Sequence, residues 1–266
     1  MLTTEQFDRT RKLALRLAGI ELCERHRDLL ASRSRRLRIS NTTGIEALLG
    51  AAEEGDPLAS RQLIGLVTTN FTGFFRHPWH FEVAAEQAAR AVRHRGQARL
   101  WSAAAATGEE PYSLAMALIE VFGRDDPPAT ILATDIDTEA LAIGAKGEYG
   151  DRSLQTLSLN RRARFFAATG GTGRQRIIAA VNRLVECRTL NLISKAWKIE
   201  GPFDVIFCRN VLMYLESRHR CAVLERLAAL LAADGLLMID PTEHLGKAGH
   251  LFTPVADAVY RRRGAS

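Results

Sequence analysis

The chain has 266 residues, 47% of them hydrophobic, which is enough for one large domain or a domain with a small appendage and excludes a disordered or fibrous protein. Its four cysteines form no C-x-x-C pair, so the sequence predicts neither a disulfide framework nor a zinc cluster and favours a reducing compartment. The N-terminus is polar and charged, and no apolar run approaches the roughly 20 residues of a membrane span, so we expect a soluble, cytoplasmic protein without membrane insertion.

The net charge of +6 is concentrated at one end of the chain. Residues 1–40 hold ten basic against five acidic side chains, including Arg33, Arg35, Arg36 and Arg38. Such a bias indicates an acidic partner, whether nucleic acid, anionic lipid or protein. The alternative is an ordinary solvated helical face.

Residues 3–66 carry apolar positions at helical spacing, which predicts several amphipathic helices. Turn-forming stretches at residues 40–44 and 53–57 separate them. We therefore expect a small helical module over residues 1–66.

From about residue 98, short apolar runs alternate with helical stretches. This order predicts a parallel β-sheet covered by helices on both faces. We expect strands at residues 98–103, 130–136, 184–190, 203–210, 235–240 and 258–263, the last one antiparallel, and helices at residues 111–123, 137–147 and 217–235. Between residues 147 and 190 the periodicity is unclear, and Gly170, Gly171 and Gly173 suggest an inserted hairpin or a flexible loop.

The stretch "LWSAAAATGEEPYSLAM", residues 100–116, joins a predicted strand to a predicted helix through small residues. In a parallel α/β sheet, ligands bind beyond the carboxyl ends of the strands. The alanines and Gly108 let a ligand approach the backbone, whereas Glu109 and Glu110 would repel a pyrophosphate. The usual Gly-rich phosphate-binding patterns are also absent. A ligand with a cationic group is indicated.

Asp135 ends the next predicted strand, where a carboxylate commonly binds the ribose hydroxyls of a nucleoside. The alternative is that Asp135 merely caps the following helix. A nucleoside that carries a positive charge and no phosphate is S-adenosylmethionine (SAM), and the two motifs together favour it.

The sequence resembles the CheR family of chemotaxis-receptor protein-glutamate methyltransferases over almost its whole length. The matching segments, in the same order and spacing, are "TTNFTGFFRHPWHF", "WSAAAATGEEPYSLAM", "ATDIDTEAL", Asn191 with Leu192, "FDVIFCRNVLMYL" and "FTPVADAVYRRR". The resemblance implies an α/β fold: a Rossmann-like class I SAM-dependent methyltransferase domain over residues 67–266, with a small inserted β-subdomain around residues 148–188. A small all-helical domain, residues 1–66, is expected before it.

The resemblance also implies the site. It places these residues at the cofactor: Asn70, Thr72, Arg76, Glu110, Asp135, Asn191, Leu192, Arg209 and Asn210. Glu110 suits the ammonium group of the methionine part, Asp135 the ribose, and Asn191 with Leu192 the adenine. Asn70 or Thr72 could instead cap a helix, and Arg76 could form an ordinary surface ion pair.

The implied reaction transfers a methyl group from SAM to a glutamate side chain of a chemoreceptor, with S-adenosylhomocysteine as the other product. Arg76 is the candidate to orient the acceptor carboxylate in a two-pronged geometry, and Tyr214 is the second catalytic candidate unless it only packs as an aromatic. The basic N-terminal helices would contact the helical methylation region of the receptor. A non-catalytic, SAM-binding regulator is the alternative. Nucleic-acid methylation is disfavoured because no aromatic stacking set accompanies the arginines.

Two further motifs indicate less about the function. His77 and His80 have a helical metal-binding spacing, but no third ligand is evident, so we expect no metal. The segment "DPTE", residues 240–243, stands where the family usually has G-H-S-E and keeps only Glu243. This departure concerns the acceptor side of the site more than the cofactor side.

Overall fold

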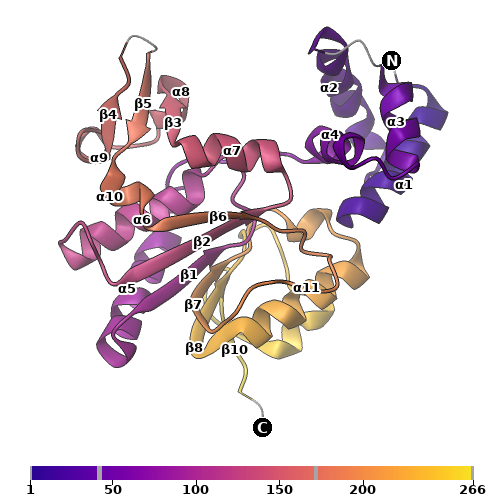
Figure 1. Ribbon diagram of the computed structural model, residues 1–266. Coiled ribbons are helices and arrows are strands. Elements are labelled where there is room, and N and C mark those ends of the chain that lie inside the picture. Colours follow the sequence, from indigo (N-terminus) through magenta and orange to yellow (C-terminus); the bar gives the residue numbers. More distant parts are fainter. Residues whose placement is uncertain (1, 41–43, 171–172, 265–266) are drawn as a thin grey trace.

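The computed structural model describes residues 2–40, 44–170 and 173–264, with the backbone alone for residues 35–40. The N-terminal part is helical and forms a separate body in Figure 1. It comprises α1 (Thr4–Ala18), a 3-10 turn η1 (Glu24–His26), α2 (Arg27–Ser40), α3 (Ile45–Glu53) and α4 (Pro57–Val67). These helices enclose their own core, in which Phe7, Leu49 and Leu63 are fully buried.

Local sequence explains where these helices begin and end. Thr3 and Gln6 form a reciprocal capping box at the start of α1, and Gly19 ends the helix in a left-handed conformation. Asp56 caps α4, where Pro57 occupies the first turn. The predicted break at residues 53–57 thus separates α3 from α4, whereas most of the break at residues 40–44 lies outside the described residues.

The main sheet has the strand order β6-β2-β1-β7-β8-β10-β9. Its strands are β1 (Ala98–Ser102), β2 (Ala129–Asp135), β6 (Val185–Thr189), β7 (Phe203–Phe207), β8 (Leu231–Met238), β9 (Phe252–Ala256) and β10 (Val259–Arg262). The pairs from β6 to β8 are parallel, and β10 pairs antiparallel with both β8 and β9. Chain order reverses direction across the sheet at β1, which places a ligand-binding crevice beyond its carboxyl end.

Helices cover both faces of this sheet, as Figure 1 shows. On one face lie α5 (Pro78–Arg95), α6 (Glu109–Phe122) and α7 (Thr138–Lys146). On the other lie α11 (Ser217–Leu230) and the irregular segment 190–202. In that segment Trp197 packs edge-on against the buried Trp101, with ring centroids 5.5 Å apart. An α/β fold with a mostly parallel sheet confirms the predicted class.

The structure corrects three details of the predicted elements. The sequence pattern did not predict α5, whose buried face consists largely of alanines that give little hydrophobic contrast. It also missed the edge strand β9. The helix predicted to reach residue 235 ends at Leu230, because Leu231 already pairs with Phe203 in the sheet.

A small antiparallel sheet is inserted between α7 and β6. It has the order β3-β5-β4, from β3 (Glu148–Gly150), β4 (Phe166–Ala168) and β5 (Arg174–Ile177). Short helices accompany it: α8 (Asp151–Leu154), α9 (Leu159–Phe165) and α10 (Ala179–Asn182). Since β6 pairs with β2 in the main sheet, we propose that the insert ends before Val185. We propose, on the separate cores, that the chain divides into a helical domain and an α/β domain near residue 67.

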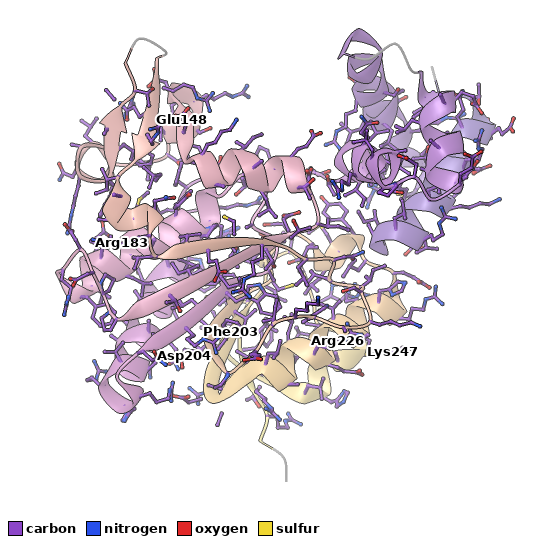
Figure 2. All side chains as sticks on the ribbon, in the orientation of Figure 1. Glu148, Arg183, Phe203, Asp204, Arg226 and Lys247 are labelled. Atoms are coloured by element: carbon purple, nitrogen blue, oxygen red, sulfur yellow. The ribbon has the colours of Figure 1, made fainter. Side chains whose placement is uncertain are left out.

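Asp204, at the amino end of β7, is buried and is held by an ion pair and a hydrogen bond (Figure 2). Its carboxylate pairs with Arg95 and accepts a hydrogen bond from the backbone nitrogen of Arg99 at 2.8 Å. The opposite, carboxyl end of the sheet is the one that opens to a pocket.

Within the described residues, no helix is both long and apolar enough to cross a bilayer.

Candidate active site

A pocket lies beyond the carboxyl ends of β1, β2 and β7, between the α/β domain and the end of α1. All ten site residues named from the sequence line it. They are Asn70, Thr72, Arg76, Glu110, Asp135, Asn191, Leu192, Arg209, Asn210 and Tyr214. Residues far apart in sequence are therefore brought together at the predicted edge of the sheet.

The small-residue turn after β1 forms one wall. Ala103, Ala104 and Ala106 line the pocket, so the ligand side of this turn is mostly backbone. Gly108 precedes α6 at φ +94°, and a Cβ there would lie 2.8 Å from the Tyr149 hydroxyl oxygen and 3.0 Å from a backbone carbon of Gly144. Only glycine fits that position. The insert thus fixes the turn, since Tyr149 also donates a hydrogen bond to the Thr107 carbonyl at 2.8 Å.

Asp135 lies at the end of β2 and organises two loops. One carboxylate oxygen accepts from the Ala106 nitrogen at 2.8 Å, and the other from the Asp137 nitrogen at 2.9 Å. Asp137, not Asp135, caps α7, which argues against the capping alternative for Asp135. Burial raises the pKa of Asp135 despite these hydrogen bonds. An ionised carboxylate has about four acceptor sites, so two remain for a ligand.

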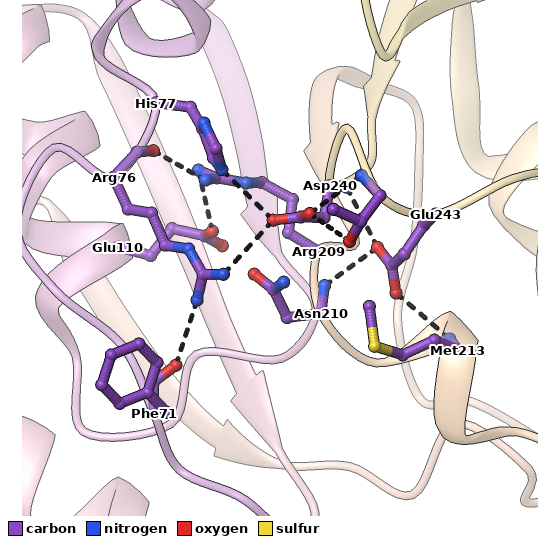
Figure 3. Close-up of polar contacts among 10 residues, drawn as sticks. Phe71, Arg76, His77, Glu110, Arg209, Asn210, Met213, Asp240 and Glu243 are labelled. Atoms are coloured by element: carbon purple, nitrogen blue, oxygen red, sulfur yellow. Dashed lines mark hydrogen bonds and ion pairs between the residues drawn. The ribbon is translucent and has the colours of Figure 1, made fainter.

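Glu110 and Arg209 face each other at the floor of the pocket (Figure 3). The two side chains are 3.3 Å apart, Glu110 Oε2 to Arg209 Nη1, and Ser102 donates to the other Glu110 oxygen at 2.8 Å. Burial raises the pKa of Glu110, opposed by Arg209 and Ser102, and burial lowers that of Arg209. The neighbouring Glu109 is bound to Thr107 instead, so only one of the two acids of the motif reaches the pocket.

Arg76 stands at the pocket in a strained backbone segment. Phe75 and His77, on either side, have φ of +51° and +60°, conformations that cost free energy for residues other than glycine. The Arg76 carbonyl accepts a hydrogen bond from the buried Arg209 side chain at 2.6 Å, and the Phe75 backbone nitrogen donates to the Ser113 hydroxyl oxygen at 2.9 Å. The Arg76 side chain remains 34% exposed and available to a second molecule.

The departing motif at residues 240–243 forms a turn behind Arg76, and its first and last residues, Asp240 and Glu243, are buried. Glu243 accepts hydrogen bonds from the backbone nitrogens of Asn210, Met213 and Asp240. Asp240 is 1% exposed, and its Oδ2 atom lies 3.7 Å from Arg76 Nη2 and 3.4 Å from His77 Nε2 (Figure 3). Burial would raise the pKa of Asp240, but Thr242, Asn210 and Arg76 outweigh it and lower the pKa to about 2. Asp240 is therefore ionised.

Several residues predicted to bind the cofactor also form contacts between segments of the protein. Asn70 donates to Asp137 Oδ2 at 2.7 Å, which fastens the segment after α4 to the start of α7 rather than capping a helix. Asn191 donates to the carbonyl of Leu17 at 2.7 Å and so binds the end of α1. Tyr214 belongs to the 3-10 turn η2 (Leu212–Tyr214), is partly buried and packs against the helical core.

No local sequence pattern predicts that the N-terminal helices reach the pocket. Ala18 and Ile20 line it, and Ile20 forms a β-bridge with Leu215. At Gly19 a Cβ would lie 2.7 Å from Ile193, so this close approach requires glycine. The lining also includes Phe71, which is 77% exposed and whose ring lies 5.6 Å from the Arg76 guanidinium carbon.

No metal cluster is formed by the His, Cys, Asp and Glu residues in the part of the chain that the structure describes. His77 contacts Asp240, whereas His80 is fully buried beside Trp79. Burial and the charge of Arg209 lower the pKa of His80 to about 3, so it is neutral. These histidines belong to the packing behind Arg76.

Replacing Arg209 by leucine is expected to lower the free energy of unfolding by about 3–5 kcal/mol, because Glu110 and Asp240 would lose a buried counter-charge. Urea unfolding measures this, and adding Glu110→Gln should recover part of the loss. Arg124→Leu, which breaks an exposed ion pair with Asp126, is the control and should change stability by less than about 1 kcal/mol. Equal effects of the two arginine substitutions on stability would contradict the role of Arg209 as a buried counter-charge.

This site has the features of a nucleoside-binding site rather than of a phosphate-binding one: a parallel sheet, a small-residue turn, and carboxylates after β1 and β2. Comparison with known proteins makes the class specific. Residues 70–260 match the family model "CheR methyltransferase, SAM binding domain".

Curated relatives match over nearly the full chain. "Chemotaxis protein methyltransferase 2" of Pseudomonas aeruginosa is 39% identical, covering 97% of this chain and 93% of that protein. The chemotaxis protein methyltransferases of Salmonella typhimurium and Escherichia coli are 37% and 36% identical, each over 97% of this chain and 90% and 91% of theirs. The chain belongs to the CheR methyltransferase family, and its cofactor is SAM.

The residues present suit that cofactor. Asp135 keeps acceptor capacity toward the pocket, Glu110 supplies negative charge, and the alanine turn leaves room against the backbone. We propose that six further residues of the pocket lining contact SAM as well: Asn70, Thr72, Asn191, Leu192, Arg209 and Asn210.

Proposed function

We propose that this protein methylates glutamate side chains of a chemoreceptor, forming glutamyl methyl esters, and that it acts in the cytoplasm. The family supports methyl transfer from SAM in chemotaxis. The observation that carries the choice of a carboxylate acceptor is Arg76, a partly exposed guanidinium beside the acidic, cofactor-binding floor of the pocket. A guanidinium is the side chain best matched to a carboxylate.

The acceptor needs little activation. A glutamate with an ordinary pKa near 4.3 is already ionised at neutral pH, so no general base is required. When bound, SAM supplies an electrophilic methyl group on its sulfonium sulfur. The protein must hold the acceptor oxygen about 3 Å from that carbon and in line with the bond between the sulfur and the methyl group. It must also remove part of the water around the acceptor oxygen. We assign the holding to Arg76, with Tyr214 as a second hydrogen-bond donor on the same pocket.

The experiment that tests this function is transfer of radiolabel from methyl-labelled SAM to the cytoplasmic fragment of a chemoreceptor. Wild type is expected to label the fragment, and the fragment with its methylatable glutamates changed to alanine is expected to stay unlabelled. Binding of SAM without transfer to any receptor fragment would instead favour a regulatory protein.

The affinity for SAM is expected to fall as the pH is lowered, and to begin falling at a higher pH than an ordinary glutamate pKa of about 4.3 would give. The reason is that burial raises the pKa of Glu110, and protonation removes the negative charge that favours a cation. Calorimetric titration between about pH 8 and pH 5 measures it. Glu110→Gln should bind more weakly and lose the steepest part of this dependence. An unchanged pH profile in that variant would remove Glu110 from the role.

The helical domain is the proposed contact for the receptor. Arg33, one of the four arginines named from the sequence, donates hydrogen bonds to the carbonyls of Leu66 and Thr68 and thus helps to hold α4. The side chains of Arg35, Arg36 and Arg38 lie outside the described residues, although their backbone continues α2. We propose docking through this end of α2 on the basis of its positive charge.

Raising the salt concentration from about 0.05 M to about 0.3 M is expected to raise the Michaelis constant for the receptor severalfold, because screening weakens attraction between basic helices and an acidic bundle. The Michaelis constant for SAM should change much less. The combined charge reversal of Arg35, Arg36 and Arg38 to Glu should mimic high salt, and Arg124→Glu is the matched control elsewhere on the surface. A salt-independent constant for the receptor would exclude electrostatic docking.

A further inference from the structure

Asp240 has an ionised, buried side chain. The roles proposed above for cofactor binding and methyl transfer do not use it. It follows β8, and the turn of residues 240–243 fixes it firmly. Its Oδ1 atom accepts from the backbone nitrogen and the hydroxyl of Thr242 at 3.0 and 2.7 Å. Its own backbone nitrogen donates to Glu243 at 3.0 Å.

The remaining oxygen, Oδ2, is buried and has no hydrogen-bond partner among the described residues. It points at two cationic or ionisable groups, Arg76 Nη2 at 3.7 Å and His77 Nε2 at 3.4 Å (Figure 3). A buried carboxylate oxygen without a hydrogen bond is costly, and the positive charge of Arg76 offsets part of that cost.

Arg76 otherwise has weak restraints. Its Nη1 atom reaches the carbonyl of Phe71 at a long 3.4 Å, and its guanidinium lies over the ring of Phe71. Phe71 itself is 77% exposed, so it is a poor anchor. Among the residues that the structure describes, Asp240 is the only acid within 4.0 Å of the Arg76 guanidinium. Asp240, which Thr242 holds in place, is therefore the charged group that restrains this side chain.

We propose that Asp240 is a positioning residue that holds Arg76 at the pocket and engages one edge of its guanidinium. This rests on the proposed function, in which Arg76 receives the acceptor carboxylate. The acceptor is then bound by the N–H groups that Asp240 leaves free, rather than by both outer nitrogens equally. Asp240 lies behind Arg76 and outside the pocket lining, so it acts on the acceptor through Arg76.

The test is a double-substitution cycle with Asp240→Asn and Arg76→Gln, both close in size to the original residues. Asp240→Asn alone is expected to lower kcat for receptor methylation about tenfold or more, with the dissociation constant for SAM within about twofold of wild type. In the Arg76→Gln background it should change kcat by less than about twofold. Asp151→Asn, which breaks an ion pair with Arg162 on the inserted sheet, is the control and should leave kcat unchanged.

A parallel cycle on urea unfolding needs no activity and separates this inference from the proposed function. The unfolding equilibrium constants of the four proteins should show coupling of about fivefold or more between Asp240 and Arg76. The same cycle with His77→Gln should show less. Additive effects of Asp240 and Arg76, or coupling of Asp240 with His77 alone, would overturn the inference. Coupling without receptor methylation would keep it and reject the function. If Asp240→Asn proves unstable, Asp240→Gly serves in both cycles.

Discussion

Asp135→Ala is expected to raise the dissociation constant for SAM at least about 100-fold. Two hydrogen bonds from ligand hydroxyls to a buried carboxylate are worth about 1.5–3 kcal/mol each, which corresponds to that factor or more. Asp135 is 8% exposed and lines the pocket, so little water replaces the lost bonds. Calorimetric titration with SAM and S-adenosylhomocysteine measures the change, and both ligands should be affected because they share the ribose.

This substitution also removes the acceptor of the Ala106 and Asp137 nitrogens, so its fold must be checked by urea unfolding. A loss of about 1–3 kcal/mol in stability is compatible with the assignment if the protein remains folded at the temperature of titration. Asp126→Ala, at an exposed acid, is the matched control. Near-normal binding by a folded Asp135→Ala protein would show that the nucleoside lies elsewhere.

Arg76→Ala is expected to lower kcat for receptor methylation by about 100-fold or more, while the dissociation constant for SAM rises less than about threefold. The difference arises because Arg76 is placed to orient the acceptor, and misplacement by about 1 Å can cost two orders of magnitude in rate. Single-turnover methylation and calorimetric titration on the same preparations measure the two quantities.

Arg76→Lys distinguishes geometry from charge. Lysine keeps the charge but not the planar fork of N–H groups, so it should recover only part of the rate. An equal loss of turnover and of SAM binding in Arg76→Ala would instead make Arg76 a cofactor-binding residue without a role at the acceptor.

The α/β fold and the place of the pocket could be predicted because both depend on local patterns. Alternating apolar runs predicted the parallel strands, and the small-residue turn with Glu110 and the strand-ending Asp135 marked the carboxyl edge of the sheet. Such signals lie within a few residues of each other in the chain. Helix α5 was not predicted because its packing face is largely made of alanines. The burial of an alanine depends on its neighbours rather than on its own hydrophobicity.

The rest of the site depends on contacts between distant segments, which the sequence does not display. Nothing local predicts that Asn191 binds the carbonyl of Leu17, or that Ile20 reaches the pocket. Asp240 was visible only as a departure from a family motif, and its partner Arg76 lies more than a hundred residues earlier. A buried ion pair of this kind is defined by tertiary structure alone.

The most direct test of the proposed reaction is mass spectrometry of a chemoreceptor fragment after incubation with the protein and SAM. We expect the mass of one methylene group to be added at glutamate residues of the helical methylation region, and we expect mild alkali to remove it as methanol. Modification that resists alkali, or that maps to lysine, arginine or histidine, would contradict a glutamyl methyl ester and the role given to Arg76.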